Sequence, residues 1–257
     1  MTTSQSTSNS SLSTRISLRW LPDPAFENTD TIVLSLLGWY VDLRVDKSTG
    51  KIDWAIAGQR IVESQDPLRV LFTHAIDSHN AFEAVDCGTF TQLPNGDDFE
   101  IGSMPRWDLP GKPVREYEEV WRELAFREGP EGPGMGVSWV LEAKRDERGV
   151  GGQDGSTVTR VYIARIWGTY VALRQEQMHS VGDSEAVVKE GGEVSAIREE
   201  WDYATGWKMK YILGPDADKL PSMTTIDTGD GDWSVGSEVI VNGQPYIVRA
   251  FERIEQE

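Results

Sequence analysis

Apolar and polar residues alternate along much of this chain with a period of two, the pattern of a β-strand that buries one face. The clearest case is residues 38–45, which have one apolar and one mostly polar face. The apolar face comprises Trp39, Val41, Leu43 and Val45, and the other face comprises Tyr40, Asp42 and Arg44. Turn residues at 47–50 and a strand-like return at 52–57 predict a hairpin from about Trp39 to Ala57.

Two Asn-Gly pairs, Asn95-Gly96 and Asn242-Gly243, indicate further hairpins. Such a pair readily adopts the positive φ angles that a tight hairpin turn requires. Strand-like runs also occupy residues 157–167, 169–177, 193–202 and 206–213. We therefore expect an all-β chain.

Residues 115–127 fit two patterns. One apolar face at helical spacing comprises Tyr117, Val120, Trp121 and Leu124. Strand alternation instead sets Tyr117, Glu119, Trp121 and Glu123 against Glu118, Val120, Arg122 and Leu124. We favour a strand because the segment lies among strands. The glutamates at 116, 118, 119 and 123 are expected to form a solvated face, partly paired with Arg115 and Arg122.

A stretch rich in Gly and Pro divides the chain. Residues 129–134 cannot hold regular structure and mark a linker between an N-terminal half, 14–128, and a C-terminal half, 135–257. The Ser/Thr-rich residues 1–13 predict a disordered tail. Each half has about eight short strands, which suits two small antiparallel β-barrels or one barrel-like sandwich.

Charge and cysteine content limit the partners and the compartment. The chain has 42 acidic and 25 basic residues and a formal charge of −17. Such a surface repels phosphates, which argues against nucleic acid and anionic membranes as partners. The single cysteine, Cys87, cannot form an internal disulfide, so we expect a packed free thiol and a cytoplasmic location. No apolar run of about 18 residues predicts a membrane-spanning helix.

Four short segments resemble a fungal family of casein-kinase-I-interacting proteins, the Hri family. They are RWLPDP at 19–24, DWAIAG at 53–58, YEEVWR at 117–122 and ARIWG at 164–168, in the order found in the family. The resemblance covers nearly the whole chain beyond the Ser-rich tail. It implies two lipocalin-like β-barrel halves and a fungal intracellular protein, but no established reaction. The Ser-rich N-terminus and the Gly-rich residues 149–155 depart from the family pattern, and they leave open whether this is a housekeeping or a specialised member.

His74 and Asp77 are candidates for acid–base chemistry. They are expected at a strand end near a barrel mouth, where they form a polar pair; a hydrogen-bonded structural role is the alternative. His79 lies five residues after His74, a spacing that does not converge metal ligands well. We expect no metal and no cofactor.

Ten tryptophans are many for a chain of this length. Trp39, Trp54, Trp121 and Trp167 each lie in a strand-like segment with apolar neighbours. They are candidate ligand-binding residues, because a barrel with aromatic residues inside can enclose an apolar ligand. The alternative is that these rings fill the barrel completely.

Two functions fit these observations. The first is a non-enzymatic protein that binds an apolar small molecule or a protein partner, such as a kinase, in a fungal cell. The alternative is a cofactor-independent isomerase or cyclase of the Diels–Alderase type, acting on a polyketide or terpenoid in secondary-metabolite biosynthesis, by analogy of fold. In that alternative the walls are Trp54, Trp121 and Trp167, and either His74 or Arg122 polarises a carbonyl group.

Overall fold

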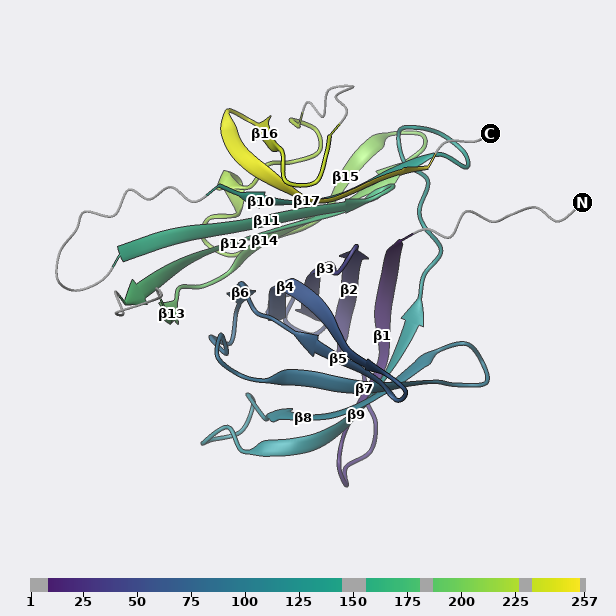
Figure 1. The fold of residues 1–257 in the computed structure, drawn as a ribbon, viewed down its shortest axis with the longest axis vertical. Helices are drawn as coiled ribbons and strands as arrows, with labels where there is room; N and C mark the ends of the chain where they lie inside the picture. The colour runs from purple at the N-terminus through teal and green to yellow at the C-terminus, as the bar shows by residue number, and fades with distance from the viewer. Residues whose placement is uncertain (1–8, 145–155, 181–186, 227–232, 255–257) are drawn as a thin grey trace, which may run out of the picture.

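The structure, a computed structural model, describes residues 9–144, 156–180, 187–226 and 233–254. The described part consists of seventeen β-strands and one short 3-10 helix. The strands form two antiparallel units that lie one on the other (Figure 1). The prediction of an all-β chain with two antiparallel halves is confirmed.

The first half is a closed barrel. Its strands are β1 (Ser10–Trp20), β2 (Thr29–Leu36), β3 (Trp39–Asp46), β4 (Ile52–Gln65), β5 (Leu68–Phe72), β6 (Ile76–Asp77), β7 (Asp86–Gln92), β8 (Asp98–Pro105) and β9 (Val114–Glu123). Eight of them follow the order β3-β2-β1-β9-β8-β7-β5-β4, and β4 pairs back with β3; β6 is added beside β4. The segment for which helix and strand competed is β9, a strand.

The second half is an eight-stranded antiparallel sheet. Its elements are β10 (Gly136–Ala143), β11 (Ser156–Ile166), β12 (Thr169–Ser180), β13 (Val187–Gly191), β14 (Ser195–Asp202), β15 (Gly206–Leu213), the 3-10 helix η1 (Ala217–Lys219), β16 (Glu238–Val241) and β17 (Gln244–Ile254). The strand order is β15-β14-β12-β11-β10-β17-β16, with β13 paired to β12. Within the described ranges, β15 and β16 are edge strands of this sheet and do not pair with each other. The first half is therefore a closed barrel, whereas the second half is an open sheet.

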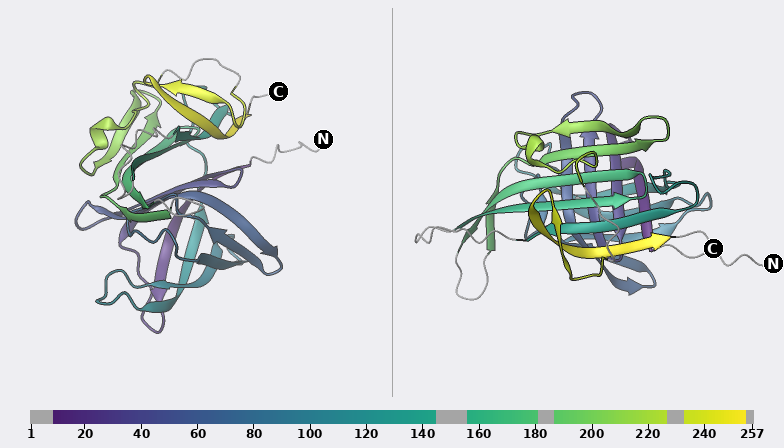
Figure 2. Two further views of the ribbon diagram at one scale, coloured as in Figure 1. Left: turned by 60° about the vertical axis from the view of Figure 1, so that its left-hand side comes forward. Right: turned by 90° about the horizontal axis from the view of Figure 1, so that it is seen from above.

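The outer wall of the barrel packs against one face of the second sheet, whose strands run across β1–β3 in the right-hand view of Figure 2. Val41 and Leu43 of β3 join Ala164 and Val171 of the second sheet in one apolar cluster, and all four are fully buried. The polar side chains of β3 point into the barrel instead. This strand is therefore buried on both faces, whereas its alternation predicted one buried face.

Polar contacts also join the halves. Oε1 of Gln175 accepts the backbone N–H of Asp77 at 3.1 Å, and Nε2 of Gln175 donates to the carbonyl of Asp77 at 2.8 Å. Arg198 pairs with Asp30 at 3.1 Å. The Gln175 bonds fix β6, and with it the position of Asp77, against the second sheet, and the Arg198 pair fixes β2.

The disordered tail was predicted to reach residue 13, but residues 10–13 belong to β1. Residues 1–8 lie outside the described part. Strand β9 ends at Glu123 and β10 begins at Gly136, so the predicted linker lies between them. The division into two domains stays an interpretation. Among the helices described, none is long and apolar enough to cross a membrane.

Candidate functional site: a polar cavity inside the first barrel

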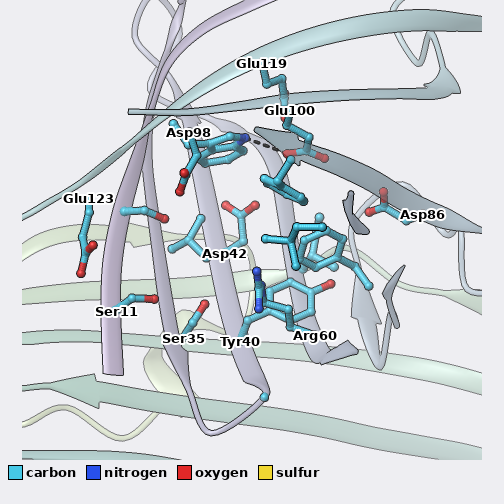
Figure 3. Close-up of a pocket in the computed structure, with 18 of the residues that line it drawn as sticks. Ser11, Ser35, Tyr40, Asp42, Arg60, Asp86, Asp98, Glu100, Glu119 and Glu123 are labelled. Carbon is cyan, nitrogen blue, oxygen red and sulfur yellow. Dashed lines mark hydrogen bonds between the residues drawn. The ribbon is translucent and has the colours of Figure 1, made fainter. Parts of the chain in front are cut away.

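A cavity of about 330 Å³ lies inside the first barrel (Figure 3). Its inner end abuts a buried cluster that includes Leu18, Trp20 and Met104. At the other end, the lining residues Leu37 and Glu123 are exposed to solvent. The cavity is therefore closed at one end and open at the other.

Strand alternation supplies the lining of this cavity. Every second residue of β3, β8 and β9 faces inward, as expected for a barrel. These inward residues are Tyr40, Asp42 and Arg44 from β3, Asp98, Glu100 and Met104 from β8, and Tyr117, Glu119, Trp121 and Glu123 from β9. Trp54 and Ile56 of β4, Phe72 of β5 and Phe90 of β7 add apolar surface. The lining is thus part aromatic and part charged.

Acidic groups outnumber basic ones in the lining. The carboxylates belong to Asp42, Asp86, Asp98, Glu100, Glu119 and Glu123, and the basic groups are Arg44 and Arg60. Small-molecule sites are mostly apolar with a few polar groups. This cavity departs from that pattern, because six of its lining residues carry a carboxyl group.

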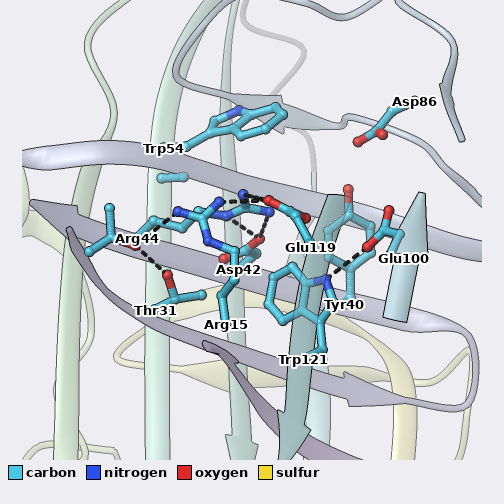
Figure 4. Close-up of polar contacts among 12 residues, drawn as sticks. Arg15, Thr31, Tyr40, Asp42, Arg44, Trp54, Asp86, Glu100, Glu119 and Trp121 are labelled. Carbon is cyan, nitrogen blue, oxygen red and sulfur yellow. Dashed lines mark hydrogen bonds and ion pairs between the residues drawn. The ribbon is translucent and has the colours of Figure 1, made fainter. Parts of the chain in front are cut away.

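Two buried arginines hold part of this charge in a network (Figure 4). Nη2 of Arg44 pairs with Oδ2 of Asp42 at 2.8 Å, and Nη1 lies 3.5 Å from Glu119. Nη1 of Arg15 donates to Glu119 at 2.7 Å, and its Nε pairs with Glu27 at 2.7 Å. Burial opposes the charge on both arginines, but the neighbouring carboxylates outweigh it and raise the pKa of each.

Arg44 also contacts aromatic rings. Its guanidinium carbon lies 4.8 Å from the centre of the Trp54 ring and 5.4 Å from that of Trp121. Stacking of this kind stabilises a desolvated guanidinium. The network therefore fixes two of the aromatic walls as well as the charges.

One oxygen of Asp42 lacks a partner in this network. Oδ2 accepts both hydrogen bonds from Arg44, whereas Oδ1 is buried with no hydrogen-bond partner among the described residues. Only 3% of the Asp42 surface is exposed, and burial raises its pKa. Asp42 thus keeps an unused acceptor on the cavity wall.

Glu100 is a buried carboxyl group between two donors. The hydroxyl of Tyr117 donates to its Oε1 at 2.7 Å, and Nε1 of Trp121 donates to its Oε2 at 2.8 Å. Burial first, and then the charge of Glu119, raise the pKa of Glu100 to about 8. The side chain leaves no room for a Cβ atom on Gly88, which explains the glycine in β7.

The predicted acid–base pair lies just behind the wall of the cavity. Nδ1 of His74 contacts Oδ2 of Asp77 at 2.8 Å, and Nε2 contacts Asp86 at 3.0 Å. Burial lowers the pKa of His74, but the hydrogen bonds to both carboxylates outweigh this effect and raise it to about 9. Asp77 also accepts Nε1–H of Trp54 at 2.9 Å. Of this group, Asp86 and Trp54 line the cavity, and His74 holds Asp86 in place.

The four predicted tryptophans divide into two pairs. Trp54 and Trp121 line the cavity. Trp39 instead stacks on Tyr162 of the second sheet, with ring centres 6.2 Å apart, and Trp167 packs on Phe126 at 5.3 Å. The expectation that Trp39 and Trp167 line this cavity is therefore not met. Trp39 shares the outward face of β3 with Val41, and Trp167 lies in the turn between β11 and β12.

Arg122 lies on the outer face of the barrel and does not line the cavity. It pairs with Asp97 at 2.8 Å, and half of its side chain is exposed. The same alternation corrects the expected solvated face of glutamates. Glu119 is buried inside the barrel, because it shares the inward face of β9 with Tyr117 and Trp121.

The remaining candidates are unremarkable in chemical terms. Cys87 is a free thiol, and burial together with a hydrogen bond to Glu63 raises its pKa, opposite to the shift that would activate it. Burial lowers the pKa of His79 to about 4. Within the described ranges, no group of three His, Cys, Asp or Glu side chains is placed to hold a metal ion.

Sequence reasoning missed the polar lining, especially Tyr40, Asp42, Arg44 and Glu100. The alternation of β3 and β9 contained the signal, since each strand carries its charged residues on the same face as an aromatic residue. In an antiparallel sheet, however, the face that carries charged residues is usually turned to solvent, so alternation alone does not indicate a charged interior.

The fold and the cavity define a lipocalin-like β-barrel protein with a second antiparallel sheet packed on its wall. The chain belongs to the HRI1 family, because the family model described as "Protein HRI1" matches residues 11–248. The predicted resemblance to the Hri family is thus confirmed.

A solved structure shares this fold. The crystal structure of the uncharacterized protein YLR301w from Saccharomyces cerevisiae is 16% identical in sequence, with a TM-score of 0.65. The match covers 95% of this chain and 99% of that one. Comparison with curated proteins found no significant match.

Proposed function

We propose that this protein binds a small molecule in the cavity of its first barrel. The observation that carries the proposal is the cavity itself, about 330 Å³ in volume and open at one end. This volume lies at the lower end of the range of roughly 300–1,000 Å³ for ligand pockets.

The lining favours a ligand with an apolar body and a polar group, rather than the wholly apolar ligand that the sequence suggested. Ile56, Phe72 and Phe90 offer an apolar wall. Asp42 and Glu100 offer buried polar groups on the same inner surface. A wholly apolar ligand would leave these groups desolvated without a partner, which costs free energy.

Blocking the cavity tests this proposal. The neutral naphthalene dye prodan, whose fluorescence reports a water-poor environment, is titrated into the wild-type protein and into Ser35→Trp. Ser35 is half-buried and lines the cavity, so an indole there fills part of the space. Ser103→Trp is the matched control, because Ser103 is exposed on β8 and is not part of the lining.

We expect saturable binding of one dye by the wild type and by Ser103→Trp, and its loss in Ser35→Trp. Circular dichroism establishes that each variant is folded. Equal binding by the two serine variants, or none by the wild type, would contradict a site in this cavity.

The cofactor-independent isomerase or cyclase is the second candidate, and one observation favours it. A buried carboxyl group whose pKa is about 8 carries a proton at neutral pH and can donate a hydrogen bond to a carbonyl group. In this proposal Glu100 takes the role suggested for His74 and Arg122, neither of which lines the cavity. Incubation with a hydrophobic extract of the source organism tests it: an isomeric product formed by the wild type but not by Glu100→Gln is expected.

Binding of a partner protein such as a kinase, and a cytoplasmic location in a fungal cell, stay predictions of the sequence analysis.

A further inference from the structure

We propose that the ligand of the barrel cavity is an organic cation with an apolar body, and that the buried carboxylates of Asp42 and Glu100 receive its charged group. This inference rests on the proposed binding function and names the class of ligand.

The charge of the lining is the first observation that favours a cationic ligand. Six carboxyl groups, of which Glu100 is protonated in the absence of a ligand, and two guanidinium groups line the cavity. Arg44 is already engaged by Asp42 and Glu119, so it does not offer a free positive charge to an anionic ligand. Arg60 is half-buried toward the mouth, where Asp98 and Glu100 act on its charge. The lining therefore attracts positive charge and repels carboxylates and phosphates.

The second observation is the unpartnered oxygen of Asp42, which is an acceptor for a charged donor. A buried acceptor without a hydrogen bond is costly, and native structures rarely leave one. Oδ1 of Asp42 is such an acceptor, on a residue that lines the cavity. An N–H donor of a ligand would satisfy it, and a charged donor would do so most strongly.

The third observation is the buried carboxyl group of Glu100, which can exchange its proton for a bound cation. The charged groups that act on it are Glu119 on β9, Asp86 on β7 and Arg60 on β4, and its neutral contacts are Tyr117 and Trp121. Without a ligand, burial and, after it, repulsion by the other carboxylates raise the pKa of Glu100 and keep a proton on it. An ammonium group in the cavity takes the place of that proton: the O–H bond of Glu100 breaks, the proton leaves to solvent, and the carboxylate pairs with the cation.

The geometry favours an extended organic cation over a metal ion. The carboxylates are distributed over β3, β7, β8 and β9, and none of the described His, Cys, Asp and Glu groups converges as a set of three on one point. Phe72, Phe90 and Ile56 in the same lining give an apolar body a surface to cover. An alkyl or aryl amine meets both requirements.

Three ligands with the same apolar body test the charge preference in the wild-type protein: n-octylamine, 1-octanol and sodium octanoate, followed by calorimetry at pH 7.5. Alkylammonium groups remain charged at this pH, with pKa values near that of lysine, about 10.4. We expect octylammonium to bind about tenfold tighter than octanol, as one charge-assisted contact provides, and octanoate to bind more weakly than either. Equal binding of amine and alcohol, or tighter binding of octanoate, would overturn the inference while leaving the binding function standing. If prodan and all three probes fail to bind, the proposed function itself fails.

Proton release tests the role of Glu100. Titrations of octylamine in two buffers with different ionisation enthalpies should show close to one proton released at pH 7. Below the pKa of Glu100, the affinity should rise by up to about tenfold per pH unit. Glu100→Gln should abolish both effects, and Glu116→Gln, which changes an exposed glutamate on the neighbouring strand β9, should keep them.

Thermal unfolding establishes whether Glu100→Gln is folded. If it is not, the proton count and pH dependence of the wild type decide the question, and Asp42→Asn serves as the second variant. Binding without proton release and without pH dependence in the wild type would overturn the role of Glu100.

Discussion

The interiors of the two halves differ in chemistry, although both halves are built from antiparallel strands. The barrel encloses charged side chains and a cavity. The face of the second sheet that points away from the barrel is packed with apolar residues such as Trp139, Leu141 and Tyr170, and Leu220 and Met223 after η1 cover it. One fold class thus supports a solid core and a hollow polar one in the same chain, and the difference lies in which residues alternate inward.

The two interiors also differ in what they contribute to stability. The apolar cluster of the second sheet and the seam between the halves bury side chains that gain free energy by leaving water. The barrel interior contains desolvated charges whose pairing at best offsets the cost of their burial. We infer that the seam and the second sheet supply most of the stability, which leaves the barrel interior free to carry polar groups.

The largest expected effect compares two tryptophans. Trp139 is 1% exposed and packs against Tyr170 and Trp233 at ring distances of 5.9 and 5.8 Å, so Trp139→Ala should lower the free energy of unfolding by about 3–5 kcal/mol. Trp121 is half-buried against the cavity, and Trp121→Ala should cost only about 1–2 kcal/mol. Urea denaturation measures both values. Equal costs would mean that the barrel interior is packed like the second sheet.

The next effect concerns the buried charges. Arg44→Met leaves Asp42 and Glu119 without one of their cations and should cost about 3 kcal/mol. The control is Arg127→Met, because Arg127 is half-exposed where it pairs with Glu200, and its loss should cost less than about 1 kcal/mol. A cost for Arg44→Met no larger than that of the control would show that the network is solvated rather than buried.

The pH dependence of stability reports on two titratable groups of the barrel, Glu100 and His74. The pKa of Glu100 is raised from 4.5 to about 8, and that of His74 from 6.5 to about 9. Both groups therefore bind protons more tightly in the folded state than in the unfolded one, so stability is lost as the pH rises through their folded pKa values. Between pH 6.5 and 9 the free energy of unfolding should fall by about 2 kcal/mol for each group, or on the order of 4 kcal/mol in total.

Urea denaturation at pH 6.5, 7.5 and 9 measures this slope. Glu100→Gln should flatten the lower part of the window. His79 opposes this slope only weakly: burial lowers its folded pKa to about 4, so only the unfolded state, with a pKa near 6.5, loses a proton in the lower part of the window. Stability that rises over this window would contradict the assigned environments of both groups.

The smallest effect is expected at Arg122. This residue pairs with Asp97 on the outer face of the barrel, away from the cavity lining. Arg122→Ala should therefore leave the affinity for prodan and octylamine unchanged, as measured by the same titrations. A loss of binding would restore Arg122 as a site residue.

Much of the fold follows from local patterns. Asn95-Gly96 and Asn242-Gly243 each lie in the connection of a predicted hairpin, β7–β8 and β16–β17. The alternation of residues 117–123 fits both a helix and a strand, and the neighbouring strands favour the strand, β9. These features depend on neighbouring residues only, and turn chemistry and strand period are local properties.

The candidate site was only partly predictable. Of the four candidate tryptophans, Trp54 and Trp121 lie in the lining, whereas Trp39 and Trp167 lie outside it. An aromatic residue in a strand is expected to be buried. When both faces of the strand are buried, the sequence alone does not show on which face the residue lies. The outer wall of the barrel is as apolar as a core because the second sheet covers it.

By itself, the sequence determined the strands, most of the turns and which residues share a face, because backbone geometry sets these within a few residues. Which face points into the barrel was decided by tertiary structure alone. Closure of β3 on β4 turns Asp42 and Arg44 inward, and the docking of the second sheet buries Val41 and Leu43 outward. The cavity and its acidic lining exist because strands distant in sequence meet around one axis, and long-range pairing of that kind is not written in any local pattern.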